Sequence, residues 1–306
     1  MTKKILILGS NSMVGNNLKE VFADRDDIFY ANRNDADLKD SFETRNLIGR
    51  YKPDVVVNLA AKVGGIQSNL ASPYDYLYDN LMIGANVIEE CRRNKVGQLI
   101  SILSTCIYPN HHNNYPLKEE YLLDGIPPES NLGYAVAKRS MAVQADLCNK
   151  QYGTKYSYLI PCNLYGRHDK YDESNSHFVA ALIKKIHEAK VKGEKKIQLW
   201  GDGTPLRQFM DAKDLALVIR FFIDNEITES CNVATDEVLT INYIAKIALF
   251  AIGCEHMEIE YINKRMNGQF RKDVDTSRLK SIMPEFKATS LYEGIIEAYK
   301  HYLTTI

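Results

Sequence analysis

Short hydrophobic runs alternate with longer segments of helical periodicity through the first half of the chain. The short runs are rich in β-branched residues and carry few polar positions, which is typical of strands buried on both faces of a sheet. The predicted strands are 5–8, 28–31, 55–59, 99–103 and 156–160, and the predicted helices between them are 16–23, 42–51, 75–94 and 134–151. This alternation predicts an α/β protein of Rossmann type, with a doubly wound parallel sheet.

The second half of the chain is less regular. Its helical periodicity predicts helices at 178–190, 215–224, 241–252 and 291–302. No repeat, low-complexity tract or Pro/Gly/Ser-rich linker divides the chain, so its two parts should share an interface. We expect a larger domain at 1–164 that is rejoined by 211–235, and a smaller α/β domain built from 165–210 and 236–306.

The charge balance excludes some partners. The 306 residues include 38 Lys and Arg against 39 Asp and Glu, a formal net charge of −1. This balance provides no broad basic field for nucleic acid or an anionic membrane, so a few placed cations must bind any anionic ligand. Because the run 5–8 is too short for a signal peptide or a membrane span, and Lys246 interrupts the most apolar later stretch, we expect a soluble, cytoplasmic protein.

The cysteines and histidines narrow the chemistry further. Six scattered cysteines without a CxxC pair are too few for a disulfide-built scaffold, so we expect reduced thiols. For an isolated cysteine we expect a buried, small hydrophobic side chain. We assign that role to Cys91, Cys148, Cys162, Cys231 and Cys254. The seven histidines form no ligand cluster, and we expect no metal site.

A loop of small residues, Gly9-Ser10-Asn11-Ser12-Met13-Val14-Gly15, follows the first predicted strand and opens a helix. This arrangement forms an anion site, because free backbone N–H groups and the helix dipole converge on a pyrophosphate. Gly9 lets the chain turn, and Gly15 lets the helix pack closely on the strand. Ser12 stands where a GxxGxxG fingerprint has its middle glycine, so a plain tight turn stays an alternative.

The end of the second predicted strand bears on the choice of dinucleotide. No Asp or Glu stands there to bind a ribose 2′-hydroxyl, and Arg33 follows the strand. A carboxylate would repel a 2′-phosphate, whereas a guanidinium binds one with two hydrogen bonds. The pattern therefore favours NADPH over NADH, with a lone surface arginine as the alternative.

Tyr134 and Lys138 lie four residues apart, on one face of a predicted helix. A phenol titrates near ~10, so it exchanges protons at neutral pH only when a nearby cation stabilises the phenolate. The chain has 19 tyrosines, and the pair alone is weak evidence. Ser104 strengthens it, because this residue ends the fourth predicted strand, at the sheet edge where ligands bind in open parallel sheets.

Several stretches together resemble the extended short-chain dehydrogenase/reductase family and, within it, the enzymes that act on GDP-linked 4-keto sugars. They are Ala60-Ala61-Lys62-Val63-Gly64-Gly65-Ile66, Ser104-Thr105-Cys106-Ile107-Tyr108-Pro109, Tyr134-Ala135-Val136-Ala137-Lys138, Asn163-Leu164-Tyr165-Gly166, Ser174-Asn175-Ser176-His177 and Trp200-Gly201-Asp202-Gly203-Thr204-Pro205-Leu206-Arg207. They span most of the chain in the order that the family has.

The resemblance implies an NADPH-dependent epimerase/reductase that inverts C3 and C5 of a GDP-4-keto-6-deoxymannose-type sugar and reduces its C4 keto group. One alternative is a C4 reductase, with or without epimerisation, of another GDP-4-keto sugar, such as a 6-deoxy-heptose or a colitose precursor. A noncatalytic nucleotide-sensing protein on the same fold is a third hypothesis. A homodimer formed through 75–94 and 134–151 is also expected.

The resemblance also implies roles for the candidate catalytic residues. Ser104 and Tyr134 would bind the C4 carbonyl, and Tyr134 would protonate it. Lys138 would bind the nicotinamide ribose and lower the pKa of Tyr134. Cys106 and His177 would act as base and acid at C3 and C5, whose protons the C4 ketone acidifies. Which of the two is the base stays open.

The binding residues follow in the same way. The implied cofactor contacts are Gly9, Asn11, Ser12, Met13, Val14, Gly15, Arg33, Asp37, Leu38, Leu59, Ala60, Ala61, Leu103, Ser104, Tyr134, Lys138, Pro161, Asn163, Leu164 and His177. The implied substrate contacts are Asn163, Lys185, Trp200, Arg207, Asn267 and Lys272. For Arg207 the alternative is a surface ion pair with Asp211. Lys185 belongs to a stretch with six lysines, 184–196, whose other interpretation is a solvated face. At Asn267 the family usually has an acidic residue, with a proline before it.

Overall fold

The computed structural model describes residues 3–172, 176–262 and 269–306. The strands in this part of the chain are β1 (Ile5–Leu8), β2 (Ile28–Ala31), β3 (Val55–Asn58), β4 (Gln98–Ile102), β5 (Tyr156–Pro161), β6 (Asn163–Tyr165), β7 (Lys196–Trp200), β8 (Leu206–Arg207), β9 (Phe209–Asp211), β10 (Cys231–Val233), β11 (Leu239–Thr240) and β12 (Glu258–Ile262).

The α-helices are α1 (Met13–Val21), α2 (Ser41–Tyr51), α3 (Ile66–Ala71), α4 (Pro73–Arg93), α5 (Leu132–Tyr152), α6 (Phe178–Lys192), α7 (Ala212–Asp224), α8 (Ile241–Ile252), α9 (Ser277–Ile282) and α10 (Leu291–Leu303). Three short 3-10 helices, η1 (Thr105–Ile107), η2 (Glu119–Leu123) and η3 (Glu129–Asn131), lie between β4 and α5 in the described chain.

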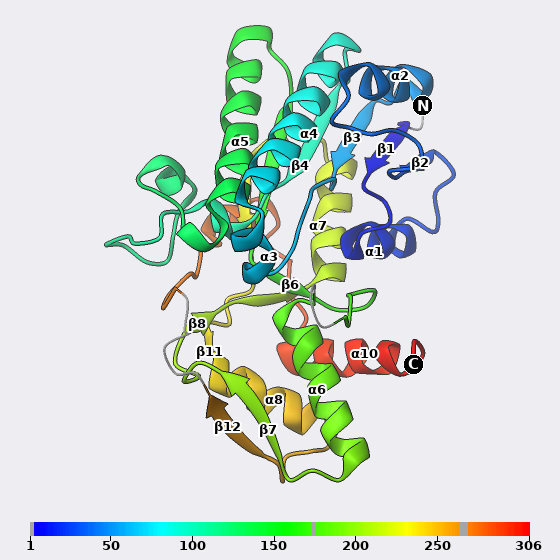
Figure 1. The fold of residues 1–306 in the computed structure, drawn as a ribbon. Helices are drawn as coiled ribbons and strands as arrows, with labels where there is room; N and C mark the ends of the chain where they lie inside the picture. The colour runs from blue at the N-terminus through cyan, green and yellow to red at the C-terminus, as the bar shows by residue number, and fades with distance from the viewer. Residues whose placement is uncertain (1–2, 173–175, 263–268) are drawn as a thin grey trace.

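The described part of the chain contains one large sheet of six parallel strands, in the order β10-β5-β4-β3-β1-β2. Every residue of β1, β3 and β4 is buried, so both faces of the sheet are covered. Helices α4 and α5 pack on each other, as do α1 and α7 (Figure 1). The predicted α/β fold with a doubly wound parallel sheet is therefore confirmed.

Capping side chains explain why two helices begin earlier than predicted. Helix α1 begins at Met13 rather than at 16, because the Ser12 hydroxyl accepts a hydrogen bond from the Gly15 N–H at 3.1 Å. Helix α7 begins at Ala212 rather than at 215, because Asp211 accepts one from the Lys213 N–H at 2.8 Å. Each cap satisfies a backbone donor that the helix leaves free.

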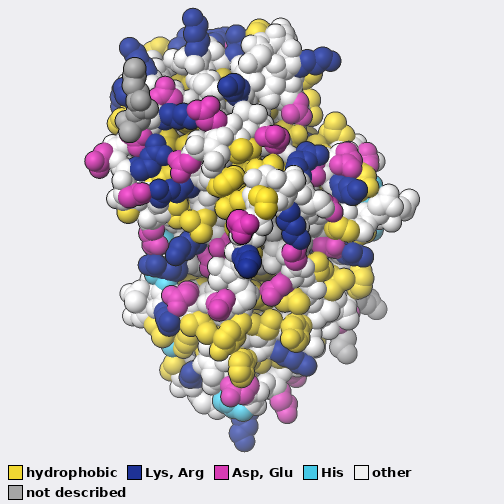
Figure 2. Space-filling view, turned by 180° about the vertical axis from the view of Figure 1, so that it is seen from behind, with side chains coloured by type: hydrophobic (Ala, Val, Ile, Leu, Met, Phe, Trp, Pro, Cys, Tyr) yellow, Lys and Arg dark blue, Asp and Glu magenta, His cyan; other side chains and the backbone are white. Residues whose placement is uncertain are grey.

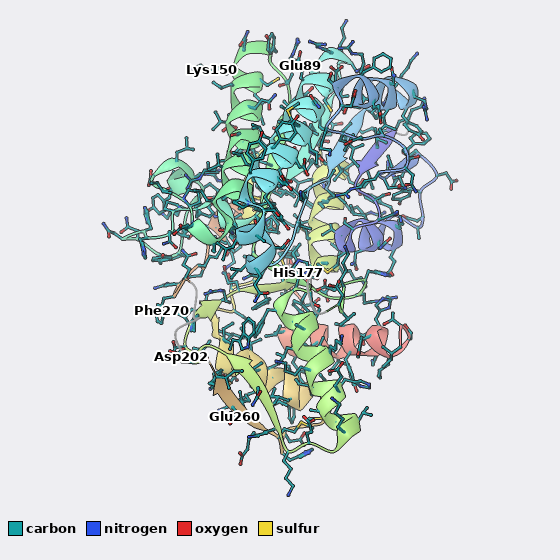
Figure 3. All side chains as sticks on the ribbon, viewed as in Figure 1. Glu89, Lys150, His177, Asp202, Glu260 and Phe270 are labelled. Atoms are coloured by element: carbon teal, nitrogen blue, oxygen red, sulfur yellow. The ribbon has the colours of Figure 1, made fainter. Side chains whose placement is uncertain are left out.

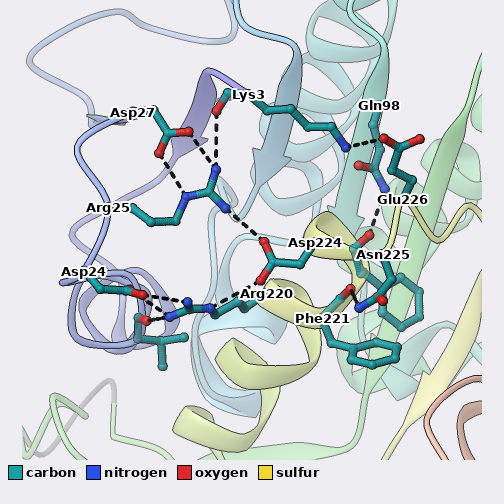
Figure 4. A network of polar contacts seen from close by, with 12 residues as sticks. Lys3, Asp24, Arg25, Asp27, Gln98, Arg220, Phe221, Asp224, Asn225 and Glu226 are labelled. Atoms are coloured by element: carbon teal, nitrogen blue, oxygen red, sulfur yellow. Dashed lines mark hydrogen bonds and ion pairs between the residues drawn. The ribbon is translucent and has the colours of Figure 1, made fainter. Parts of the chain in front are cut away.

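An ion-pair network joins the start of the sheet to the end of α7 (Figure 4). Arg25 pairs with Asp27 at 2.7 Å and with Asp224 at 2.9 Å. Arg220 pairs with Asp24 at 2.7 Å and with Asp224 at 3.4 Å. These groups lie at the N-terminal ends of the strands, opposite the edge where ligands bind in such folds. We therefore assign the network to stability.

A second hydrophobic cluster lies below the sheet in Figure 1, built from residues between Tyr165 and Tyr302. Helices α6, α8 and α10 surround it, together with the strand pair β7–β12. Part of the second half of the chain returns to the larger cluster, since Met210 and Val233 belong to the core of the large sheet. Val274 and Leu279 also pack there. The division into two domains at the residues given above stays a prediction.

The charged side chains on the surface are of both signs, as the near-zero net charge predicts. Figure 2 shows Lys and Arg side chains interspersed with Asp and Glu on the face seen there, rather than gathered by sign. Within the described residues, no helix combines the length and the apolar composition that crossing a membrane needs.

Candidate active site

The loop between β1 and α1 has the geometry of an anion site. Gly9 has a φ of +78°, and a Cβ there would lie 2.8 Å from the Ala60 backbone nitrogen. A Cβ on Gly15 would lie 2.5 Å from the Ser10 carbonyl oxygen. Both positions therefore require glycine, as the sequence predicted.

Ser12 adopts an extended backbone, with φ −73° and ψ 167°, so this position does not need the fingerprint's middle glycine. Its hydroxyl accepts a hydrogen bond from the Gly15 N–H. Among the described residues, the backbone N–H groups of Met13 and Val14 have no hydrogen-bond partner. These two donors stand at the N-terminus of α1, where a pyrophosphate would bind. The loop thus fits the dinucleotide that the sequence predicted.

Further predicted cofactor residues surround this loop. Arg33 is exposed in the turn after β2. Asp37 and Leu38 lie in the following segment, where the Leu38 carbonyl accepts a hydrogen bond from Asn86 at 3.0 Å. Leu59 continues β3, and its N–H donates to the Leu8 carbonyl at 3.0 Å. Ala60 and Ala61 follow it, and Leu103, Pro161, Asn163 and Leu164 lie at the carboxyl ends of β4 and β5 and in β6.

Ser104 and Cys106 stand at the carboxyl end of β4, where the 3-10 helix η1 begins. Ser104 caps η1, and its hydroxyl accepts a hydrogen bond from the Cys106 N–H at 3.3 Å. Of the six cysteines, Cys106 is half-buried and the other five are buried, as expected for those five. The cap therefore fixes the spacing between the hydroxyl and the thiol.

Tyr134 and Lys138 lie on the first turns of α5. The Lys138 ammonium is 5.9 Å from the centre of the Tyr134 ring, and it donates a hydrogen bond to the Ile102 carbonyl at 2.8 Å. Burial lowers the pKa of Lys138 to about 8. Burial, followed by the charge on Cys106, raises the pKa of Tyr134. Burial thus outweighs any lowering of the Tyr134 pKa by Lys138, and that lowering stays a prediction.

The Cys106 thiol has a cation beside it. Lys272 donates a hydrogen bond from its Nζ to the Cys106 Sγ at 3.0 Å. Burial by itself raises the pKa of the thiol, but the nearby ammonium and hydrogen bonds from Ser104, Lys272 and Asn131 outweigh burial, and the pKa is lowered. Burial raises the pKa of Cys91, Cys162, Cys231 and Cys254. The structure thus distinguishes Cys106 from these four thiols.

His177 stands at the N-cap position of α6, without a side-chain capping hydrogen bond in the described chain, and lies close to where the two parts of the molecule meet (Figure 3). Its Nδ1 donates a hydrogen bond to Asp169 at 2.8 Å, and this bond raises the pKa of the imidazole. The Asp169 carboxylate is 2% exposed, while the histidine side chain is 51% exposed. Among the described residues, the side chain of His177 hydrogen-bonds Asp169, and no hydrogen bond joins it to Cys106.

Four of the predicted substrate residues lie on α6, β6, β7 and β8. Lys185 donates to the Gln198 carbonyl at 2.6 Å. Arg207 donates to the Leu206 carbonyl at 2.8 Å, and burial lowers its pKa. In the described chain Arg207 makes no ion pair with Asp211, because that carboxylate caps α7. Asn163 donates to the Gln208 carbonyl at 2.9 Å, Trp200 is 53% exposed at the end of β7, and Asn267 lies outside the described residues.

Sequence reasoning missed two contacts at this site. Asp169 accepts a hydrogen bond from His177. Lys272 donates a hydrogen bond to the Cys106 sulfur, whereas the sequence predicted only a substrate contact for this lysine. Nothing in the sequence pairs an aspartate with a histidine eight positions later, or a lysine with a cysteine 166 positions earlier. Both contacts depend on loops that long-range hydrogen bonds hold in place.

The fold and the site together define a dinucleotide-binding α/β protein with a serine, a tyrosine and a lysine at the carboxyl edge of its sheet. The model of the NAD dependent epimerase/dehydratase family matches residues 5–234, and the chain belongs to that family.

Its relatives include GDP-L-fucose synthase of Sinorhizobium fredii, 35% identical over 99% of this chain and 96% of that protein. The structure is also similar to a GDP-L-fucose synthetase from Naegleria fowleri bound to NADP, with a TM-score of 0.89 and 26% identity, covering 100% of this chain and 94% of that one. A GDP-6-OMe-4-keto-L-xylo-heptose reductase from C. jejuni has a TM-score of 0.90 and 26% identity, covering 100% and 99%.

Proposed function

We propose that the protein is an NADPH-dependent epimerase/reductase that converts a GDP-4-keto-6-deoxymannose-type sugar to GDP-L-fucose. The observation that carries the proposal is the place of Cys106. This thiol lies two residues beyond Ser104, and its charge acts on the pKa of Tyr134. A candidate base for carbon acids and a candidate proton donor for a ketone thus share one site, as an enzyme that both epimerises and reduces requires.

For the reduction, we propose that the loop 9–15 and Arg33 hold the cofactor. The NADPH that these residues would hold would supply the hydride for reduction at C4 of the sugar. Ser104 donates a hydrogen bond to the C4 carbonyl oxygen, and Tyr134 gives that oxygen its hydroxyl proton. A phenol with a raised pKa keeps its proton until the developing alkoxide takes it. Lys138 binds the nicotinamide ribose and can replace the Tyr134 proton.

For the epimerisation, the C4 ketone acidifies the protons at C3 and C5. Removal of either proton sends the bonding electron pair to the C4 carbonyl oxygen, giving an enolate. Inversion then requires a proton from the opposite face. The lowered pKa of Cys106 and the raised pKa of His177 favour a thiolate that removes the proton and an imidazolium that returns one.

We propose that Lys185 and Arg207 supply the cations for the diphosphate, and that Asn163 and Trp200 belong to the substrate site. An exposed indole can stack on a base or a sugar ring. A cationic side chain whose described partners are carbonyl oxygens can still gain an anion, as is the case for Arg207 and Lys185.

The second candidate function is C4 reduction of another GDP-4-keto sugar, such as a heptose, without epimerisation. The similarity to the C. jejuni heptose reductase favours it. Such an enzyme needs Ser104, Tyr134 and Lys138, but it has no use for a thiol whose pKa a neighbouring lysine lowers against the effect of burial. The environment of Cys106 therefore favours the epimerase/reductase.

The test is incubation of the purified protein with NADPH and a panel of GDP-4-keto sugars, with the products identified by NMR. We expect NADPH consumption and GDP-L-fucose from the 6-deoxymannose derivative. Consumption of NADPH with a C4-reduced product of unchanged C3 and C5 configuration would establish the second candidate. Absence of consumption with every sugar would leave the noncatalytic hypothesis.

We also propose a homodimer formed through α4 and α5. Tyr74, Tyr78 and Leu81 form an exposed apolar stripe on α4, and Leu132 and Val136 are partly exposed on α5. An apolar hollow of about 540 Å³ lies between the N-terminal ends of these helices. An exposed apolar face on two packed helices suits a symmetric interface. We expect twice the monomer mass in light scattering, and a monomer mass would contradict the proposal.

We propose that 1–164 with 211–235 forms the NADP-binding domain, and that 165–210 with 236–306 forms the nucleotide-sugar-binding domain. The two hydrophobic clusters support most of this division. Met210 and the segment around Val274 and Leu279 are exceptions, because they pack in the larger cluster. Because this segment passes from the smaller domain to the larger cluster, it brings Lys272 to the large sheet. The cytoplasmic location stays a prediction.

A further inference from the structure

Lys272 reaches Cys106 because its segment is fixed beside the chain that follows Cys106. The Leu117 N–H donates to the Asp273 carbonyl at 2.9 Å, and the Asp275 N–H donates to the Leu117 carbonyl at 2.8 Å. Leu117 and Val274 thereby form an isolated parallel bridge. This bridge places the residue before Asp273 next to the loop between β4 and α5.

Two buried amides hold the bridge from the other side. Gln208, 3% exposed, donates to the Val274 carbonyl at 3.3 Å and accepts from the Val274 N–H at 2.9 Å. Asn232, 0% exposed, donates to the Leu117 carbonyl at 3.1 Å and to the Asp275 carbonyl at 3.2 Å. Because each buried backbone group is satisfied, moving the segment would break several hydrogen bonds at once.

A further bond fixes the segment before Lys272. Gln269 donates from its amide to the Asn110 carbonyl at 2.9 Å, four residues beyond Cys106. Lys272 thus lies between two attachment points on the loop that carries the thiol. Neighbouring Arg271 does not share its position, since it pairs with Asp273 at 2.6 Å. The contact of 3.0 Å between Nζ and Sγ is therefore set by the fold.

We propose that Lys272 is a positioning residue that holds the sulfur of Cys106 as a thiolate, ready to remove a proton from the substrate. This inference rests on the proposed function for its catalytic meaning, but the state of the sulfur does not depend on it. The sulfur loses its proton to solvent before substrate binds. An ammonium at hydrogen-bond distance favours the charged form of the thiol, whereas burial alone opposes it.

Lys272 on this account differs from Lys185, which hydrogen-bonds the Gln198 carbonyl. Arg207 and Tyr134 also face the sulfur, since the charge on Cys106 acts on the pKa of both, but the described lysine that hydrogen-bonds the sulfur is Lys272. A lysine that only binds the diphosphate would change the KM for the sugar nucleotide and leave the sulfur unaffected. A lysine that holds the thiolate changes the titration of Cys106 in the protein with no ligand. The two roles are therefore separable without any substrate.

The experiment measures the rate of Cys106 alkylation by iodoacetamide across pH, with the protein free of NADPH and sugar, and with the modified peptide quantified by mass spectrometry. The other five cysteines are buried and serve as internal references. We expect the wild-type rate to reach half its maximum below about 8.5, the ordinary titration midpoint of a cysteine. A midpoint at or above that value would overturn the proposal, and this arm needs no variant.

Variants then assign the effect to Lys272. In Lys272→Gln we expect the rate at pH 7 to fall about tenfold or more and the midpoint to move to higher pH, because burial remains and the cation is gone. Lys272→Arg should restore part of the wild-type rate, since it keeps the charge. The matched control is Lys280→Gln, which removes an ammonium that pairs with Asp236 on the surface, and its profile should match the wild type.

Deuterium incorporation into the sugar tests the catalytic role of Lys272 separately. In deuterated solvent with the GDP-4-keto sugar, Lys272→Gln should lose deuterium incorporation at C3 and C5 in proportion to the loss of alkylation. Profiles of Lys272→Gln and wild type that superimpose, with a raised KM, would overturn the inference and leave a phosphate ligand. A shifted profile together with a wild type that incorporates no deuterium would support the thiolate and contradict the proposed function instead.

Discussion

In the larger part of the molecule the candidate groups stand on long regular elements, whereas in the smaller part they stand on short strands and loop ends. Tyr134 and Lys138 share the helix α5, which spans Leu132–Tyr152, and Ser104 follows a strand that is buried throughout. Arg207 instead lies in a strand of two residues, and His177 is the cap of a helix. The larger part thus positions the groups for hydride chemistry on long regular elements, while hydrogen bonds between short elements and loops position the groups of the smaller part.

The largest effect should come from Tyr134→Phe. Loss of the proton donor should lower NADPH-dependent C4 reduction by about 10²–10⁴-fold, the usual contribution of a positioned acid. Tyr152→Phe is the matched control, since Tyr152 is exposed at the other end of the same helix. Rates are followed by NADPH absorbance. Equal rates for Tyr134→Phe and wild type would remove Tyr134 from the mechanism.

The sequence predicted the larger part well because its signals are local. Five of the six strands of the large sheet are mostly apolar runs that the sequence predicted, and the short strand β10 was not predicted. Gly9, Gly15, Tyr134 and Lys138 are recognised from their spacing along the chain. The smaller part was harder to predict, because His177 depends on Asp169 and Lys272 depends on a bridge to Leu117. Such contacts join residues that only the folded chain brings together.

Gly15→Ala tests the rigid cofactor loop. An added Cβ would lie 2.5 Å from the Ser10 carbonyl, so the helix must move away from the strand. We expect a loss of about 1–3 kcal/mol in the free energy of unfolding and weaker NADPH binding. Gly49→Ala is the control, because its Cβ would meet its nearest atom at 3.5 Å. Chemical unfolding and a fluorescence titration with NADPH measure both, and identical results for the two variants would contradict the close packing.

Asp169→Asn tests the hydrogen bond that positions His177 in the smaller part. The Asp169 hydrogen bond raises the pKa of His177, so an activity that needs the imidazolium is present below that pKa and lost as the pH rises through it. The variant should move this loss to lower pH and reduce deuterium exchange at neutral pH by about tenfold. NMR titration of the His177 ring gives the pKa directly. An unchanged titration would show that the carboxylate has no influence on the ring.

Ser12→Ala should have the smallest effect. Removing the cap of α1 leaves the Gly15 N–H without its partner and should cost about 1 kcal/mol of the free energy of unfolding. Ser12→Asn keeps a capping side chain and should cost less. Urea unfolding measures both variants. Equal stability of Ser12→Ala and wild type would mean that the cap has no energetic role.

The most direct test of the account is solvent exchange in Tyr134→Phe, because the account assigns reduction and epimerisation to different side chains. The variant is incubated in deuterated water with the GDP-4-keto-6-deoxymannose-type sugar and NADPH, and both C3 and C5 are followed by NMR. We predict deuterium at both carbons through Cys106 and His177, while NADPH consumption is lost. Loss of exchange together with reduction would contradict the separation of the two sets of groups.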